Sequence, residues 1–168
     1  MEPTFRVVST SEATLASDLV QQSFADLAAS DWGPHARQAF FNESAPIALT
    51  HALNTAIFAA GAFVEGAMVG FVLLPRPSQL SMLFVHPDYL RKGIARQLWE
   101  EARSHVEANF PEIKTIELNA TPYAVNFYRS VGFVPISAEF TVDGCRATRM
   151  VCWLPARRLN ATAPNICQ

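Results

Sequence analysis

The sequence predicts a mixed α/β fold, in which a mostly antiparallel sheet of about six to seven strands is flanked by about four helices. Three observations support this prediction. Short apolar runs of strand length alternate with amphipathic segments of helical spacing. Two of the runs flank the turn dipeptide Glu65-Gly66, and a long amphipathic segment at 93–109 separates one strand-like run from the next. This order of elements places helices on both faces of the sheet.

The N-terminal third predicts one strand followed by helical segments. Residues 5–8 read as the strand, and Ser11 is placed to cap a helix whose apolar side chains recur at helical spacing, namely Leu15, Leu19, Val20, Phe24 and Leu27. Residues 30–41 contain the breaker sequence Asp-Trp-Gly-Pro and predict irregular chain or a broken helix. Residues 43–56 predict another helix.

The rest of the chain predicts six strands and two helices. The strand-like runs occur at 57–64, 68–74, 80–85, 114–120, 133–141 and 146–154. The turn Asp143-Gly144 pairs the last two runs in a hairpin. A helix over 93–109 presents one apolar stripe, and a shorter helix is capped by Thr121, has Pro122 at its first position and is closed by Gly132.

Length and composition predict one domain and exclude several classes of protein. The chain has 168 residues, 50% of them apolar and 17% charged, so we expect a domain over 1–156 and a patternless tail over 157–168. A net charge of −2 gives no electrostatic basis for binding nucleic acid. No apolar run approaches the roughly 20 residues of a membrane span, and the start does not resemble a signal peptide.

Three cysteines bear on metal binding and on the compartment. Cys145, Cys152 and Cys167 lack the spacing of a metal site, so we expect no bound metal. Cys145 and Cys152 lie on one predicted strand, too far apart to form a disulfide with each other. A sparse and odd number of thiols fits the reducing cytoplasm.

One segment predicts an anion-binding site. The strand-like run Leu83, Phe84 and Val85 leads through a turn at 86–88 into a cationic loop and then into the helix that begins near Gly93. The N-terminus of a helix presents backbone N–H groups without partners and favours negative charge, so this junction predicts a phosphate site. The local cations are Arg91, Lys92 and Arg96. Because the chain as a whole is slightly acidic, these cations predict a small anion site rather than a basic surface.

A second segment, residues 119–133, makes the interpretation more specific. Together the two segments resemble the GNAT superfamily of acetyl-CoA-dependent N-acetyltransferases, over about residues 5–154. The family's loop reads [QR]-x-x-G-x-[GA], and this chain has Leu90-Arg-Lys-Gly-Ile-Ala95 there. Leu90 departs from the family's Gln or Arg, which removes one polar contact. The family's Asn-x-x-x-x-Ala-x-x-Phe-Tyr-x-x-x-Gly-Phe block is matched by Asn119, Ala124, Phe127, Tyr128, Gly132 and Phe133.

The resemblance implies the GNAT fold, with a splay between the fourth and fifth strands that receives the pantetheine arm of acetyl-CoA. The cofactor-binding residues that it implies are Leu83, Phe84, Val85, Leu90, Arg91, Lys92, Gly93, Ile94, Ala95, Arg96, Asn119, Asn126 and Tyr128. One backbone N–H of Leu83 or Val85 would face the thioester oxygen. For Lys92 and Arg96, ordinary solvated cations at a helix start remain an equal alternative.

The implied catalytic residues are Tyr128 and Asn119. A phenol with a pKa near 10 stays protonated at neutral pH and can protonate the departing thiolate. The alternative for Tyr128 is an aromatic side chain that packs beside Phe127, and for Asn119 it is a turn residue that ends a strand. The resemblance also implies an amine acceptor, either a small molecule or a peptide, and a homodimer formed through residues 146–154.

The general base and the acceptor site each have several candidate residues. The strand before the loop offers no carboxylate, because Gln79, Ser81 and Met82 stand there. A chain of waters, or one of Glu117, Glu139 and His51, would have to remove the proton of the amine. The side chains that could line the acceptor site, or belong to the core instead, are Trp32, Phe40, Phe41 and Phe140. Such aromatic walls favour a small, partly apolar acceptor. A non-catalytic module that binds or senses acyl-CoA is the alternative function.

Overall fold

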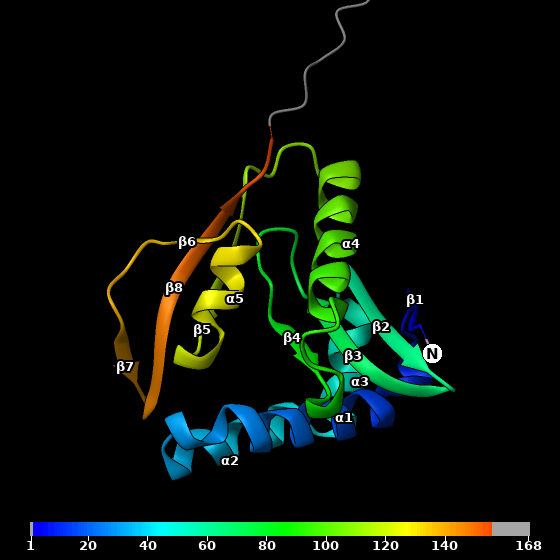
Figure 1. Ribbon diagram of the computed structural model, residues 1–168, viewed down its shortest axis with the longest axis horizontal. Helices are drawn as coiled ribbons and strands as arrows, with labels where there is room; N and C mark the ends of the chain where they lie inside the picture. Colours follow the sequence, from blue (N-terminus) through cyan, green and yellow to red (C-terminus); the bar gives the residue numbers. More distant parts are fainter. Residues whose placement is uncertain (1, 156–168) are drawn as a thin grey trace, which may run out of the picture.

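The computed structural model describes residues 2–155 of the chain. Within this range the chain forms five α-helices: α1 Ala13–Leu27, α2 Pro34–Glu43, α3 Pro46–Thr55, α4 Ile94–Asn109 and α5 Val125–Ser130. The same range contains eight strands: β1 Thr4–Val7, β2 Phe58–Val64, β3 Ala67–Leu74, β4 Met82–Val85, β5 Thr115–Ala120, β6 Val134–Pro135, β7 Phe140–Val142 and β8 Cys145–Trp153 (Figure 1). Tail residues 157–168 and Cys167 lie outside the described residues.

The strands form two sheets that meet over a short stretch. The first sheet has the order β1-β2-β3-β4, and in the second β8 pairs with β5, β6 and β7. The Leu80 N–H donates to the Glu117 carbonyl at 3.0 Å, and the Glu117 N–H donates to the Ser78 carbonyl at 2.9 Å. Beyond this junction β4 and β5 belong to different sheets and diverge (Figure 1). The predicted mixed fold and the splay between the fourth and fifth strands are therefore confirmed.

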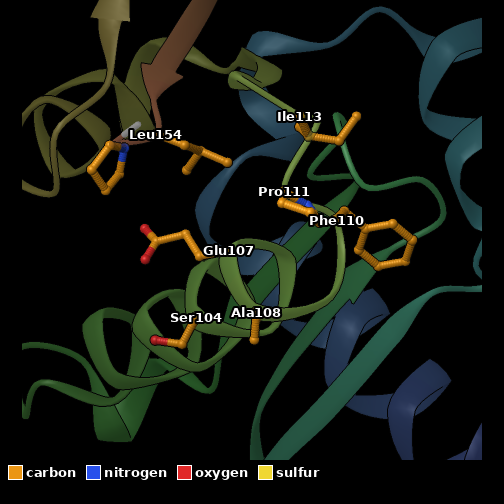
Figure 2. A pocket seen from close by; sticks show the side chains of 8 residues that line it. Ser104, Glu107, Ala108, Phe110, Pro111, Ile113 and Leu154 are labelled. Atoms are coloured by element: carbon orange, nitrogen blue, oxygen red, sulfur yellow. The ribbon is translucent and has the colours of Figure 1, made fainter. Parts of the chain in front are cut away.

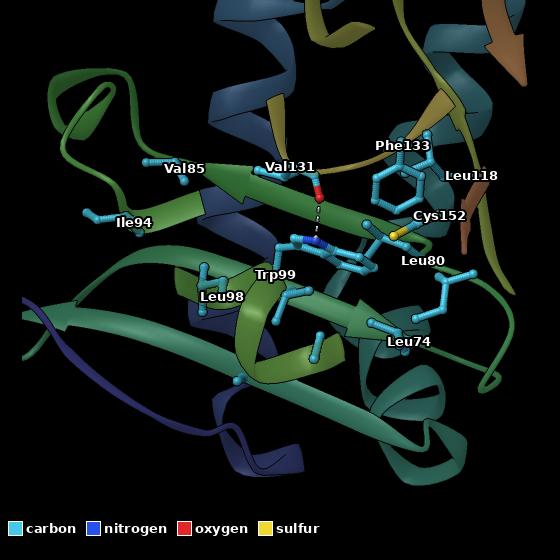
Figure 3. Close-up of a cluster of buried hydrophobic side chains, with 14 of the residues drawn as sticks. Leu74, Leu80, Val85, Ile94, Leu98, Trp99, Leu118, Val131, Phe133 and Cys152 are labelled. Atoms are coloured by element: carbon cyan, nitrogen blue, oxygen red, sulfur yellow. Dashed lines mark hydrogen bonds between the residues drawn. The ribbon is translucent and has the colours of Figure 1, made fainter. Parts of the chain in front are cut away.

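Helices cover both faces of the first sheet. α4 packs on β2, β3 and β4, and its buried side chains Leu98 and Trp99 lie in a core cluster that extends to Cys152 of the second sheet and to Phe133, just before β6 (Figure 3). α1 and α3 pack against each other on the opposite face, where a second cluster includes Leu49 and Phe71. α4 therefore spans the junction between the sheets and holds them together. None of the helices within residues 2–155 has the length and hydropathy of a membrane span.

Both predicted hairpin turns form, and they share one backbone geometry. Glu65 and Gly66 have φ values of 51° and 84°, and Asp143 and Gly144 have values of 50° and 81°. Two consecutive residues with positive φ match the type I′ turn, whose twist suits an antiparallel hairpin. The first turn joins β2 to β3 and the second joins β7 to β8.

The start of α1 differs from the prediction. Ser9, not Ser11, is the capping residue, and a short 3-10 turn over Thr10–Glu12 precedes the helix. The Ser9 N–H donates to the Glu12 carboxylate at 3.0 Å. Ser9 has a glutamate three residues later, which completes a capping box, whereas Ser11 has Thr14 at that position.

The segment between α1 and β2 forms two proline-started helices. The expected break around Asp31 is present as a 3-10 turn over Ala29–Asp31, and α2 follows it directly. A helix starting at Glu43 was the wrong expectation, because α2 ends there and α3 begins at Pro46. Ala45, just before that proline, has extended backbone with φ −63° and ψ 154°. A proline disfavours helical backbone in the residue before it, which explains the break.

Two C-terminal predictions also need correction. The expected strand over 133–141 is divided into β6 and β7. The Ile136 N–H still donates to the Arg149 carbonyl at 2.8 Å, but the Arg149 N–H donates to the Ser137 hydroxyl at 3.0 Å instead of to a backbone carbonyl, which ends the ladder there. The expected helix after Thr121 begins as a 3-10 turn over Pro122–Ala124 and becomes α-helical only in α5. Cys145 and Cys152 are free thiols, as their spacing along β8 predicts.

Candidate active site

The loop between β4 and α4 has a backbone that two left-handed residues determine. Arg91 has a φ of 60° and Gly93 a φ of 81°, and Gly93 is the residue that caps α4. A Cβ atom on Gly93 would find no atom within 4 Å. The glycine is therefore required by its left-handed backbone and not by crowding within the protein, and the space in front of it is open.

The backbone N–H groups of residues 91–96 are free. Within the described residues, none of them meets a backbone or side-chain acceptor, and the first helical bond here runs from the Gln97 N–H to the Gly93 carbonyl at 3.0 Å. The positive end of the dipole of the 16-residue helix α4 lies at the same place and also attracts negative charge. Successive free N–H groups at such a turn form a concave site for an anion with several oxygens, such as a diphosphate.

The side chains of this loop have mixed roles. The ammonium of Lys92 lies 4.6 Å from the centre of the Tyr89 ring, and Lys92 is exposed. One guanidinium nitrogen of Arg96 donates to the Ser130 carbonyl at 3.3 Å, so Arg96 is directed toward α5. Leu90 and Ala95 pack against the α4 core cluster, and Ile94 is buried within it. Leu90 thus contributes to the core at the position where the family has a polar residue.

The backbone of β4 presents free groups toward the splay. β4 is the edge strand of its sheet, and the His86 N–H donates to the Val69 carbonyl at 2.9 Å in register with the pair Phe84–Phe71. Because bonded and non-bonded pairs alternate in an antiparallel ladder, the N–H and C=O groups of Leu83 and Val85 point away from β3. These are the two residues whose backbone the family resemblance assigns to the cofactor.

A bulge separates this part of β4 from the junction of the sheets. The Ser81 N–H donates to the Leu73 carbonyl at 3.0 Å, and Met82 is also the register partner of Leu73. Two residues of one strand therefore lie opposite one residue of the other, as in a β-bulge. Bulges bend a strand, which accounts for the divergence of β4 from β5 after Leu80.

Tyr128 lies on α5 against the core. Its ring makes edge contacts with Phe127 and Phe133, with ring centres 5.3 and 5.4 Å apart. Burial raises the pKa of the Tyr128 phenol above its ordinary value. Its hydroxyl has no hydrogen-bond partner among residues 2–155, and it is not among their fully covered unpaired polar atoms. The phenol therefore remains a protonated donor that is available to a bound group.

The two asparagines lie apart from this ring. Asn119 is exposed on β5, in register with Arg149, while its neighbours Leu118 and Ala120 point into the α4 core. Side chains alternate along a strand, so Asn119 faces the side of the sheet opposite α4. Asn126 is exposed on α5.

Among the three candidate bases, Glu117 is the one adjacent to the splay. It lies on β5 at the junction with Gln79, and its carboxylate accepts from Arg149 at 2.6 Å. Glu139 is paired with Arg146 at 2.8 Å, close to the β7–β8 hairpin. His51 is exposed on α3.

Aromatic rings connect α1 and α2 to β4 on the side opposite α4. Phe40 stacks on Phe24 with ring centres 4.0 Å apart, and it lies 5.6 Å from Trp32 and 5.8 Å from Phe84. The sequence offered Trp32, Phe40 and Phe41 as wall or core residues, and the structure groups them with the buried ring of Phe24 and with Phe84. Phe140 lies on β7 and, within the described chain, has no ring contact with this cluster.

Two surface pockets lie beside α4, one at its C-terminal end and one along its length. One of about 270 Å³ lies between the C-terminal end of α4 and the end of β8, and its lining residues include Glu107, Phe110 and Leu154 (Figure 2). The other, of about 570 Å³, lies between α4 and β1 and is lined in part by Val7 and His105. Neither pocket includes a residue of the 91–96 loop.

A bulged edge strand and a loop of free N–H groups at a helix start are the features expected of a protein that binds an acyl-coenzyme. A family profile described as an acetyltransferase (GNAT) domain matches residues 16–154. The chain therefore belongs to the GNAT acetyltransferase family, whose enzymes use acetyl-CoA. No curated protein matches the chain by sequence at a significant level.

Solved structures show the same fold at low sequence identity. A GCN5-related N-acetyltransferase from Rhodopseudomonas palustris, also described as a class-II aminotransferase, has a TM-score of 0.78 at 22% identity, over 92% of this chain and 97% of that one. PaiA N-acetyltransferase from Thermoplasma acidophilum, in complex with coenzyme A, has a TM-score of 0.75 at 19% identity, over 92% and 100%. The ribosomal-protein-S18-alanine N-acetyltransferase from Escherichia coli has a TM-score of 0.65 at 20% identity, over 94% and 98%.

Proposed function

We propose that this protein transfers an acetyl group from acetyl-CoA directly to a primary amine of a small-molecule or peptide acceptor. The observation that carries the proposal is the set of free backbone N–H groups at residues 91–96, next to the free edge of β4. The free N–H groups at residues 91–96 suit the diphosphate of the coenzyme, and the free edge of β4 suits its pantetheine arm. The solved complex of PaiA with coenzyme A has the same fold, which supports this use of the two features.

The chain supplies the oxyanion donor from its backbone. The N–H group of Leu83 or Val85, which points into the splay, would donate to the thioester oxygen as negative charge develops on it. Loss of one such donor typically lowers kcat by about 10² to 10³. The side chain makes no contribution to this bond, so the identities of Leu83 and Val85 matter through packing only.

Tyr128 is the proposed general acid. Departure of the coenzyme produces a thiolate, which needs a proton, and a phenol can supply it. Because burial raises the pKa of Tyr128, its proton is present throughout the neutral range. The two ring contacts to Phe127 and Phe133 fix the orientation of the phenol.

The proton of the amine is removed by water or by Glu117. Neutralising a lysine-like amine at pH 7 costs about 4.6 kcal/mol, whereas an α-amine costs about 1 kcal/mol. Glu117 is engaged by Arg149 and does not stand on β4, so the assistance available here suits an amine of lower basicity. The partly exposed rings of Trp32 and Phe40 favour an acceptor with an apolar part.

Thiol release from acetyl-CoA with a panel of amines tests the proposal. We expect turnover with at least one amine, and we expect Tyr128→Phe to lower kcat by about 10²-fold while leaving coenzyme binding unchanged. Tyr123→Phe is the matched control, because Tyr123 is 53% exposed on the turn just before α5. Coenzyme binding without thiol release from any amine would instead indicate a non-catalytic acyl-CoA sensor.

A further inference from the structure

Every backbone carbonyl at the C-terminal end of α5 has a partner. The Phe127 carbonyl accepts from the Ser130 hydroxyl at 2.6 Å. The Tyr128 carbonyl accepts from the N–H groups of Val131 and Phe133, and the Arg129 carbonyl accepts from that of Gly132. Local chain thus satisfies three of the carbonyls that a helix end leaves free. The carbonyls of Ser130 and Val131 remain, and their partners come from elsewhere.

Both of these partners are side chains of α4. A guanidinium nitrogen of Arg96 donates to the Ser130 carbonyl at 3.3 Å, and the indole N–H of Trp99 donates to the Val131 carbonyl at 3.3 Å (Figure 3 shows the second bond). Residues three apart on a helix share one face, so Arg96 and Trp99 act side by side. Arg96 lies within the free N–H loop of α4, which places this contact at the coenzyme end of the helix.

A packed route joins the same two elements. The Trp99 ring is fully buried and lies 4.7 Å from the Phe133 ring, measured between centres. The Phe133 ring lies 5.4 Å from the Tyr128 ring. Trp99 therefore reaches Tyr128 through a hydrogen bond at the end of α5 and through one intervening ring.

α5 needs such support because it is short. It has six residues, and isolated helices of this length are not stable in water. Its position is set by what holds its ends, and its C-terminal end is held by α4. Any movement of that end moves Tyr128, which lies two residues before the last residue of the helix.

From this geometry we infer that Arg96 and Trp99 are positioning residues, which hold the Tyr128 phenol at a fixed place relative to the coenzyme-binding start of α4. The inference rests on the proposed function, in which Tyr128 protonates the coenzyme sulfur. It assigns Arg96 to α5 rather than to a phosphate. It also gives the indole N–H of Trp99 a function that a purely apolar core residue could not serve.

A double-mutant cycle separates positioning from general packing. Trp99→Phe removes the N–H donor but keeps an aromatic ring. We expect it to lower kcat by about tenfold, because small misplacements of a catalytic group are costly, and to leave the KM for acetyl-CoA unchanged. In a Tyr128→Phe background the same substitution should lower kcat no further. An equal loss in both backgrounds, or no loss in either, overturns the inference.

The Arg96 series tests the same inference without changing the core. Arg96→Gln should lower kcat severalfold, and Arg96→Lys, which keeps a cationic donor, should recover much of the loss. A raised KM for acetyl-CoA with unchanged kcat would instead show that Arg96 binds phosphate, and would overturn its assigned role. Glu101→Gln is the matched control, since Glu101 lies on α4 and its carboxylate contacts Gln97 of the same helix.

The two proposals fail in different ways. If no amine supports thiol release, the proposed function is wrong. If amines are acetylated and Tyr128→Phe keeps full turnover, another group is the general acid. The positioning role of Arg96 and Trp99 is then overturned, and the proposed acetyl transfer is retained. If Tyr128→Phe is slow and both Trp99→Phe and Arg96→Gln are as fast as the parent, only the positioning role is overturned.

Discussion

The backbone N–H of Gly33 donates to the carbonyl of Gly144 at 2.8 Å, joining the segment between α1 and α2 to the turn before β8. Next to this bond, Trp32 and Cys145 form an isolated antiparallel bridge. The Trp32 ring contacts Phe40, which contacts Phe84 on β4. The two sheets meet at Glu117 and are also connected indirectly through this bond, so the contact between the two glycines forms a second link between them.

Substitution of Gly144 should destabilise the protein through this contact. A Cβ on Gly144 would lie 3.3 Å from the Gly33 Cα and would also occupy a residue with φ +81°. The backbone conformation alone costs an alanine about 1–2 kcal/mol, and overpacking adds about 1 kcal/mol or more. We therefore expect Gly144→Ala to lower the free energy of unfolding, measured by urea denaturation, by about 2–3 kcal/mol.

Gly66→Ala is the matched control for this prediction. Gly66 occupies the same place in the other hairpin, with φ +84°, and a Cβ there would meet no atom within 4 Å. Gly66→Ala should therefore lower the free energy of unfolding by the cost of the left-handed backbone alone, about 1–2 kcal/mol. If the two alanine variants lose equal stability, the close approach of Gly33 and Gly144 contributes nothing.

Substitution of Gly93 should weaken coenzyme binding more than it weakens the fold. The protein itself leaves room for a side chain there, since no atom lies within 4 Å of the Cβ position. A β-branched side chain would occupy the space through which a diphosphate approaches the free N–H groups. We expect Gly93→Val to raise the Kd for coenzyme A, measured by calorimetry, by more than about tenfold. Gly66→Val, with a similar backbone, should leave that Kd unchanged.

The pair of Arg6 and Glu12 should make stability depend on pH at the acidic end. The Arg6 guanidinium lies 2.6 Å from the Glu12 carboxylate and, with the Ser9 N–H, lowers the pKa of Glu12 to about 2. A lowered pKa in the folded state means that the stabilisation is present above the ordinary pKa of about 4.3 and is lost as pH falls toward 2. We expect Glu12→Gln to cost about 1 kcal/mol at pH 7, a typical value for a helix cap.

The control for this prediction is the parent protein at low pH. The difference in unfolding free energy between the parent and Glu12→Gln should shrink as pH is lowered from about 5 to about 2.5. Over this range the Glu12 carboxylate of the parent becomes protonated in the unfolded chain, which stabilises the unfolded state of the parent. A difference that stays constant over this range would show that Glu12 acts by something other than its charge.

Features encoded in contiguous residues were predictable from the sequence. The two hairpin turns follow from Glu65-Gly66 and Asp143-Gly144, since these dipeptides suit positive φ at both positions. The left-handed Gly93 at the start of α4 follows from a strand, a glycine and an amphipathic helix in that order. Tyr128 became a candidate because the residues around it resemble a family block, and the structure places its half-buried ring on α5, where its role as an acid remains a proposal.

Features that depend on distant residues were not predictable. Arg96 was a candidate phosphate ligand or an ordinary solvated cation at the helix start, and nothing near it in the sequence indicates its contact with Ser130, 34 residues away. Phe84 was assigned to the cofactor strand without regard to its ring, since only the register with Phe71 reveals that the ring faces the side opposite α4. Contacts of this kind depend on strand register and on helix packing, which no local pattern encodes.

Tyr128 should make the protein less stable at alkaline pH. Burial raises the pKa of its phenol in the folded state above the ordinary value near 10. A raised pKa means that the stabilisation is fully present below about pH 10 and is lost as pH rises above it, because the unfolded chain then releases the proton that the folded chain retains. Urea denaturation at about pH 8 and pH 11 should therefore show a smaller decline for Tyr128→Phe than for the parent protein. Tyr123→Phe, which changes an exposed residue, is the matched control, and its free energy of unfolding should decline as that of the parent does. An identical decline in all three proteins would mean that Tyr128 ionises as freely in the folded chain as in the unfolded one.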